Sequence, residues 1–438
     1  MNDLSPYTAS PPKNAPRSRT AEESTGSGVL SAGPLLLTAV AFGLYWLTGV
    51  LLASRYATGH FGADATHYAM LADFTVHYRV ARFHPVTATM GVAWMKAFSF
   101  LTPWLAPATI LQAYFAAVGA LGVWAAMAAF AALLPRSYVL LGGILYGSSF
   151  GIWYFSGIPE SKILTATLSV LYIASYAHFR ERWSLSGAIQ LSVILALACL
   201  NEVVSAFLVI IPIVDALMKR GFDWGHSRWL SAHVTVVLVA WLLLDVVVNG
   251  WFIPESTVPQ GKSHYNMLLY YIARNDYGFA SLHGFISNWF FFNIVAPTPH
   301  ALHWPEAGGY FTPTLLAYLT SPLAIATLLA VTLVGAVNLI PRYRAVSLGP
   351  AGELLLPIAA YAVVRGVFFF IFNPSEPLLF SPAVTFAHWS LLLVPFVASP
   401  FPAKRELLAA LCVLLLATNA GFMLGPDGWA DFVVGRHG

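Results

Sequence analysis

The sequence predicts an all-α protein that crosses a membrane many times. Hydrophobic residues make up 58% of the 438-residue chain and charged residues only 9%, a composition far from that of soluble globular domains. Apolar runs of membrane-spanning length recur from one end of the chain to the other. Each run must be helical, because an unpaired backbone group in hydrocarbon costs several kcal/mol. We therefore expect a polytopic helical bundle.

The apolar runs predict about eleven transmembrane helices by the usual length criterion. These runs cover residues 34–54, 108–133, 138–156, 162–179, 185–200, 203–218, 229–250, 312–339, 352–372, 381–400 and 406–425. Two shorter apolar stretches, 86–101 and 283–298, are not counted as spans. We expect these two to form re-entrant or interfacial helices on the outer face.

The basic residues give the orientation of the predicted bundle. With the amino terminus in the cytoplasm, the inner connections, such as "PRYRAVSLGP" and "FPAKRE", carry more Lys and Arg than the longer outer segments, as the positive-inside rule requires. Counting 86–101 as a full span would put both of these connections outside. The predicted regions are a disordered cytoplasmic tail (1–32), a membrane domain (33–425) with outer loops at 55–107 and 251–311, and an external tail (426–438).

The composition also excludes several classes of function and site. The net charge of +3 comes from basic residues that the topology places in cytoplasmic loops, so nucleic-acid binding is not expected. Cys199 and Cys412 lie inside apolar runs and predict neither a disulfide framework nor a thiolate metal site. The histidine-containing stretches "HALH" and "GHFGADATH" lack a signature spacing such as HExxH. We expect no cofactor, and a divalent metal is not indicated.

The polar residues concentrate on the predicted outer face. About half of the carboxylates and most of the histidines fall in outer segments, whereas a transport pathway would place such groups along the spans. The halves of the chain also show no internal repeat of the kind common in transporters. A lipid or glycan transporter or flippase remains the alternative function, together with another enzyme of lipid-linked substrates such as a polysaccharide ligase.

Two acidic motifs stand at characteristic places in this layout. The first span is followed by a long outer loop with an early acidic residue in "GADATHY", and a short outer connection, "SGIPESK", joins the third and fourth spans. This arrangement resembles the GT-C superfamily of membrane glycosyltransferases, which includes protein O-mannosyltransferases, aminoarabinose transferases and the catalytic subunits of oligosaccharyltransferases. By this resemblance, Asp64 corresponds to the catalytic aspartate of the first loop and Glu160 to the second acidic position.

The resemblance implies a reaction and a location. A sugar would pass from a polyprenyl-phosphate carrier to a glycan, lipid or protein acceptor at the outer face of a membrane, such as the inner membrane of a bacterium. The cytoplasmic loops contain no glycine-rich, phosphate-cradling motif for a nucleotide sugar. This absence also favours a lipid-linked donor.

Transfer from a lipid phosphate requires a carboxylate that deprotonates the acceptor hydroxyl and cations that hold the departing phosphate. Asp64 follows Gly59 and Gly62, where the chain can approach a substrate closely, although capping a helix is an alternative role for this aspartate. Glu160 follows a proline at a predicted helix start, so it could serve only to stabilise that helix end. Glu376, between two prolines in an outer turn, has the same two interpretations.

Arg365 is the most informative candidate for the phosphate site, because a cation within a span requires a counter-charge or a function. The structural alternative is an ion pair with Glu353 or Asp245. The remaining candidate substrate-binding residues are His67, Tyr68, Lys262, His264 and Arg274. The last three flank or belong to "HYNMLLYYIARNDY", whose aromatic and basic residues suit binding to sugar and phosphate.

Residues 61–85 are predicted to form an outer helical segment that presents Asp64 to the acceptor. Tyr68, Leu71 and Phe74 would anchor this segment on the membrane surface.

Overall fold

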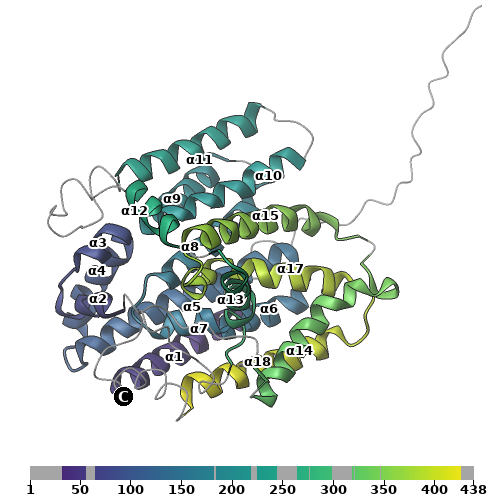
Figure 1. The fold of residues 1–438 in the computed structure, drawn as a ribbon, viewed down its shortest axis with the longest axis horizontal. Helices are drawn as coiled ribbons and strands as arrows, with labels where there is room; N and C mark the ends of the chain where they lie inside the picture. Colours follow the sequence, from purple (N-terminus) through teal and green to yellow (C-terminus); the bar gives the residue numbers. More distant parts are fainter. Residues whose placement is uncertain are drawn as a thin grey trace, which may run out of the picture.

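The computed structural model describes residues 32–55, 65–181, 184–218, 224–243, 264–275, 277–297, 318–319, 321–345 and 347–425. These residues form a bundle of helices with short connections (Figure 1), and no strand occurs among them. The predicted all-α class is therefore confirmed. Asp64, Lys262 and the tails 1–31 and 426–438 lie outside the described residues, as do large parts of the loop at 251–311.

Eighteen α-helices occur in this part of the chain. They are α1 (Ala32–Arg55), α2 (Ala65–Ala69), α3 (Tyr78–Phe83), α4 (Pro85–Leu101), α5 (Pro107–Leu133), α6 (Arg136–Ser148), α7 (Phe150–Gly157), α8 (Lys162–Phe179), α9 (Leu185–Asn201), α10 (Ile210–Met218), α11 (Trp224–Leu242), α12 (His264–Arg274), α13 (Phe279–Ile286), α14 (Pro322–Ala336), α15 (Gly349–Phe372), α16 (Pro377–Phe380), α17 (Thr385–Ala398) and α18 (Lys404–Leu424). Shorter 3-10 helices include η1 (Met70–Asp73), η2 (Val203–Val209) and η10 (Ser381–Val384), and η5 (Ser287–Phe292) is a π-helix.

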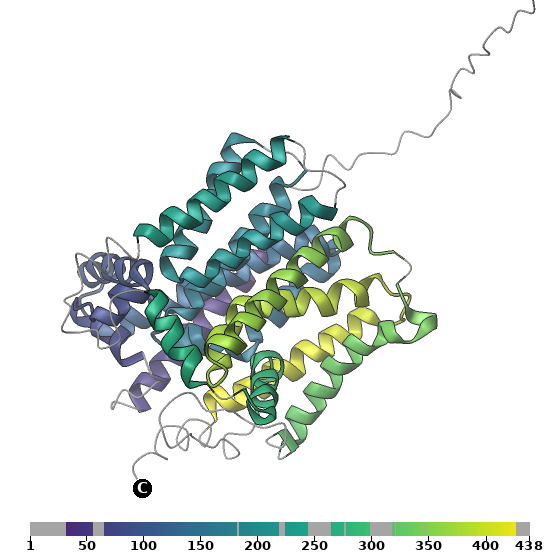
Figure 2. The same ribbon diagram turned by 45° about the horizontal axis from the view of Figure 1, so that its top comes forward.

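Every predicted span contains helix, but the expected number of about eleven spans by the length criterion is not confirmed. Among the described residues, six helices are long and apolar enough to cross a membrane, or seven if the bent pair α6–α7 forms one span. Three more apolar helical segments, at 185–201, 203–218 and 231–242, are shorter. The chain is an integral membrane protein whose spans differ in length, and its short helices pack against longer neighbours (Figure 2).

Helix α5 forms the centre of the bundle. It packs against α1, α6 and α8, and two thirds of its most apolar stretch is buried (67%). Small residues permit this close packing, because a Cβ atom at Gly119 would overlap the Ser156 side chain of α7. Glycines at helix interfaces allow the close backbone approach that stabilises helix pairs in membranes.

Helices α2, α3 and α4 lie together beside one end of the bundle (Figure 1). The prediction that Tyr68, Leu71 and Phe74 all lie on the membrane surface is wrong for two of them. Tyr68 and Leu71 are buried, and only Phe74 is exposed. The Tyr68 ring contacts Phe115 of α5, and Leu71 packs against Gly91 of α4. These apolar groups therefore fix the outer segment to the bundle.

The second short apolar stretch, 283–298, enters the bundle. After α13 and the π-helix η5, residues 293–296 are buried and lie against the break between α6 and α7, which meet at 59°. The amide of Phe150 donates to the Ile294 carbonyl (3.0 Å) and that of Gly151 to the Asn293 carbonyl (2.9 Å). Asn419 of α18 donates to the carbonyls of Ser148 (2.7 Å) and Ile294 (2.8 Å). The broken helix thus keeps its polar backbone groups paired.

An ionic cluster lies at the carboxyl-terminal end of α8. Arg180 contacts Asp215 of α10 (3.3 Å) and Glu353 of α15 (2.7 Å). Tyr176 donates a hydrogen bond to Asp215 (2.6 Å). We call Arg180, Asp215 and Glu353 the Arg180 cluster. It lies at the end of the bundle that the basic residues predict to be cytoplasmic.

The predicted orientation can be tested by cysteine labelling in intact cells. Thr75 precedes α3 in the outer segment, Ser347 precedes α15, and both are exposed. A membrane-impermeant thiol reagent should label Thr75→Cys and should reach Ser347→Cys only after the cells are opened. The native Cys199 and Cys412 are buried, so background labelling should be low. Labelling of Ser347→Cys but not of Thr75→Cys in intact cells would reverse the orientation.

Candidate functional site

Three charged side chains are buried together near the end of the bundle that carries α2–α4. Glu202 contacts Lys162 through Oε1 (3.2 Å) and Arg365 through Oε2 (2.8 Å). Lys162, Glu202 and Arg365 are 5%, 6% and 1% exposed. Lys162 begins α8, Glu202 connects α9 to η2, and Arg365 lies in the second half of α15. We call these three residues the Glu202 cluster.

The residue before Glu202 fixes the position of this connection. The Asn201 carboxamide oxygen accepts hydrogen bonds from the Thr87 amide (3.1 Å) and hydroxyl (2.8 Å) of α4. Its amide nitrogen donates to Thr165 of α8 (3.1 Å), and the Asn201 carbonyl accepts from Nδ1 of His84 (2.7 Å). Asn201 therefore joins α4, α8 and α9 next to the charged groups.

The surroundings of Glu202 keep its carboxylate ionised. Burial by itself raises the pKa of Glu202, but the positive charges of Lys162 and Arg365, with a contribution from His84, outweigh this effect and lower the pKa to about 2. Opposite charges a few ångströms away favour the charged form of a carboxyl group in this way. The two cations and one carboxylate leave the Glu202 cluster with one net positive charge.

Arg365 has hydrogen-bonding capacity that the described residues do not use. Its NH2 atom contacts Glu202, and the Tyr361 side chain also lies close enough to interact with the guanidinium. By hydrogen-bond geometry, neither Nε nor NH1 has a partner among the described residues. Phe369 lies beneath the guanidinium, 4.9 Å from its carbon to the ring centre, and Lys162 Nζ lies 4.8 Å from the ring centre of Phe380. A buried polar group without a partner is costly, so the free donors of Arg365 suit an anionic ligand.

Of the two ion pairs considered from the sequence, the one between Arg365 and Glu353 is not formed. Glu353 binds Arg180 at the other end of the bundle, and Asp245 lies outside the described residues. Glu353 and Arg365 belong to the same helix, α15, and the twelve residues between their positions correspond to roughly 18 Å at 1.5 Å per residue. The counter-charge that a buried arginine requires is Glu202 instead.

Glu160 is buried two positions before Lys162. Its Oε1 atom accepts hydrogen bonds from the amide (2.9 Å) and the hydroxyl (3.2 Å) of Ser161. These contacts place a negative charge at the start of α8, where it interacts favourably with the helix dipole. The helix-end role is therefore visible in the structure, whereas the catalytic role of Glu160 stays a prediction.

The other predicted site residues are more scattered. The Tyr68 ring lies near His84, with ring centres 6.1 Å apart, which places it close to Asn201. His67 stacks on His77 at 3.8 Å. Arg274 is exposed and contacts Tyr270, and Glu376 accepts a hydrogen bond from Asn373 (2.6 Å). His264 begins α12, and only its backbone is described; Asp64 and Lys262 are not described.

Sequence reasoning missed Lys162 and Glu202 as site residues. Both lie in short outer connections, "SGIPESK" and "LNEVV", in which a charged residue directly adjoins an apolar helix. Such a residue is held at the bundle surface or within it, because the connection is too short to carry it away. Within the described part of the chain, no group of three or more His, Cys, Asp or Glu residues could hold a metal ion.

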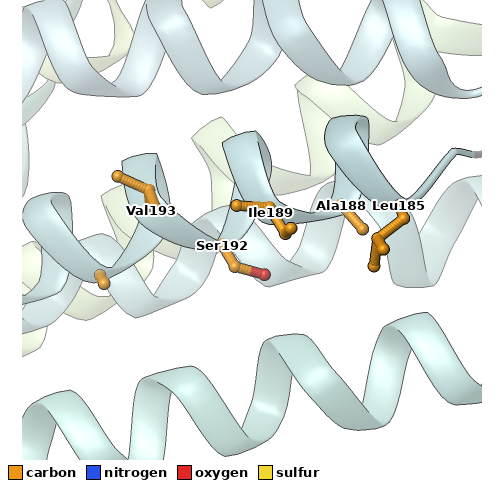
Figure 3. Close-up of a pocket in the computed structure, with 6 residues that line it drawn as sticks. Leu185, Ala188, Ile189, Ser192 and Val193 are labelled. Carbon is orange, nitrogen blue, oxygen red and sulfur yellow. The ribbon is translucent and has the colours of Figure 1, made fainter.

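A shallow apolar groove on α9 is separate from this site (Figure 3). Its lining residues are Leu185, Ala188, Ile189, Ser192, Val193 and Ala196. Ser192 is the one polar side chain among them, and none of them titrates. The groove therefore lacks the groups that acid–base or phosphate chemistry requires.

Comparison with known proteins identifies the fold. No protein-family model and no curated protein sequence matches the chain. The chain is similar to the crystal structure of ArnT from Cupriavidus metallidurans bound to undecaprenyl phosphate, with a TM-score of 0.52 and 15% sequence identity over 92% of this chain and 77% of that chain. The chain therefore shares the fold of that ArnT structure.

Replacing Arg365 by Met should destabilise the protein. The change leaves Glu202 with Lys162 alone, and removal of one partner from a buried ion pair costs about 3–5 kcal/mol. We expect Arg365→Met to unfold several degrees below the wild type in a thermal unfolding experiment in detergent. The matched control is Arg405→Met, in which the arginine is exposed on α18 and the change should stay within about 0.5 kcal/mol. Equal unfolding temperatures for the two variants would contradict the ionic role of Arg365.

Proposed function

We propose that this protein is a membrane glycosyltransferase that transfers a sugar from a polyprenyl-phosphate-linked donor to a glycan, lipid or protein acceptor at the outer face of a membrane. The observation that carries the proposal is the buried Glu202 cluster, with its net positive charge and the free donors of Arg365. The GT-C fold supports it, because the similar ArnT structure contains undecaprenyl phosphate. The proposed location is the inner membrane of a bacterium.

Arg365 and Lys162 are the proposed ligands of the carrier phosphate. Lys162 has three N–H donors and Arg365 has five, of which the contacts with Glu202 occupy only part. The departing phosphate gains negative charge as its bond to the sugar breaks, and donors fixed in a water-poor site stabilise that charge strongly. Arg365 can in addition bind two phosphate oxygens at once.

Asp64 is the proposed general base. It takes the proton of the acceptor hydroxyl while the hydroxyl oxygen forms a bond to the anomeric carbon of the sugar. The bond between that carbon and the phosphate oxygen breaks, and its electron pair leaves with the polyprenyl phosphate. Glu160, buried beside Lys162, is the second proposed acidic residue of the site. The reaction needs no cofactor to balance.

Asp64→Asn separates the catalytic role from the helix-capping role. Asparagine keeps the size and the capping ability of aspartate but cannot accept the proton. We expect transfer to fall by about a hundredfold or more, the usual scale for loss of a general base, while the donor still binds. Transfer can be followed by mass spectrometry of the lipid and glycan fractions. Nearly normal transfer by a folded Asp64→Asn protein would move the role of base to Glu160 and then to Glu376.

Lys162→Met and Arg365→Met should each weaken binding of undecaprenyl phosphate about tenfold or more, because a hydrogen bond to a charged group contributes about 1.5–3 kcal/mol. Binding is measured on the folded fraction of each variant, for example by fluorescence with a labelled lipid. Arg405→Met is the control and should bind as the wild type does. Unchanged affinity in both site variants would remove the Glu202 cluster from the donor site.

A further inference from the structure

Glu202 is an unusual component of a phosphate site, because it is negatively charged. Both of its oxygens face the cations that would bind the phosphate, at 3.2 Å from Lys162 and 2.8 Å from Arg365. The carboxylate is buried, so solvent screens it little. Its presence lowers the positive potential that any bound anion experiences.

The substrate and the product of the proposed reaction differ in charge. The donor contains a phosphodiester, which carries one negative charge, as each phosphate of a nucleic acid does. Transfer of the sugar leaves a phosphomonoester, which carries about −1.5 to −2 charges near pH 7. The proton released by the acceptor hydroxyl passes to the base and then to water. The product lipid is therefore the more strongly charged ligand.

From this charge difference we infer that Glu202 sets the charge preference of the site, favouring the singly charged donor over the more highly charged carrier phosphate. This inference rests on the proposed function. Lys162 and Arg365 alone would present two positive charges, and a dianion would neutralise them. Glu202 between them cancels one of these charges, and the buried Glu160 close to Lys162 lowers the remaining potential further, so the site favours a ligand with fewer charges.

The energetic argument is the interaction of one additional charge with Glu202. The attraction of a second negative charge on the ligand is weaker in a site of charge +1 than in a site of charge +2. The cost of removing that charge from water is the same in both sites. Buried charge without compensation is strongly disfavoured. Glu202 therefore reduces the advantage of the product in binding and favours exchange of the spent carrier for a new donor.

The position of Glu202 in the chain fits this role. It lies on the connection between α9 and η2, and the adjacent Asn201 is fixed by hydrogen bonds to α4 and α8. The backbone that carries the carboxylate is thus fixed by contacts other than its ion pairs with Lys162 and Arg365. Glu202 is a positioning and charge-setting residue, not a group that touches the sugar.

The test compares two lipids with the same chain. Undecaprenyl phosphate serves as the monoester, and its methyl ester serves as a diester with a single charge, so the result does not depend on the identity of the sugar. The dissociation constant of each lipid is measured at pH 8 for the wild type and for Glu202→Gln. The readout is the ratio of diester to monoester dissociation constants, in which a general loss of affinity cancels.

We expect Glu202→Gln to raise this ratio about tenfold or more in favour of the monoester, because one buried charge acts on one additional ligand charge at short range. Glu202→Asp keeps the charge and should keep the wild-type ratio. The matched control is Asp215→Asn, the same type of change at a buried carboxylate of the Arg180 cluster. It should lower the unfolding temperature without changing the ratio.

If Glu202→Gln does not fold, the same comparison is made in the Arg365→Met background, in which Glu202 faces Lys162 alone. There, Glu202→Gln changes the net charge of the remaining pair from zero to +1 and should again raise the ratio. An unchanged ratio in variants that bind both lipids would overturn the role of Glu202 while leaving the proposed function intact. If the wild type binds neither lipid, the proposed function itself fails, and the inference fails with it.

Discussion

Glu202 bridges Lys162 and Arg365, one through each carboxylate oxygen. The end of the bundle that contains the Glu202 cluster depends on this interaction. Two cations buried in a membrane protein are stable only with a counter-charge, because removing one partner of a buried pair costs about 3–5 kcal/mol. Glu202 provides this charge to two helices from distant parts of the chain, α8 and α15. The contact therefore determines both the packing of the helices and the electrostatic potential of the site.

The same helices are joined again at their other ends. Arg180, directly after α8, contacts Asp215 and Glu353 there, so the helical segment from η2 to α10 has a carboxylate at its beginning and another near its end. Each carboxylate contacts a cation at one end of α8. Ion pairs at both ends oppose sliding of these helices along one another. Functional groups are positioned more precisely on rigid helices than on loops.

The sequence was sufficient to predict the helical class and the location of most long helices, because both follow from local apolar runs. It did not predict α12 or the break between α6 and α7 within the predicted span 138–156. It was less informative about which helices cross a membrane. Helices α9 and α10 are shorter than a usual span and pack against the longer helices α8 and α15. The partner of Arg365 was beyond prediction from a single sequence, because Glu202 is distant in the chain and the two carboxylates considered, Glu353 and Asp245, were as plausible by charge alone. Tyr68 and Leu71 were misplaced for a related reason: their burial depends on Gly91 and Phe115, which belong to other helices.

The break between α6 and α7 has a consequence for biosynthesis. The amides of Phe150 and Gly151 are paired with carbonyls of Ile294 and Asn293, which the ribosome makes much later. Until that segment emerges, the broken helix has no protein partner for these groups within the lipid, where water is scarce. The packing of the amino-terminal helices around this break therefore stays incomplete until residues 293–296 have been made. Final closure of the bundle is a late event of assembly, after residues 293–296 have entered.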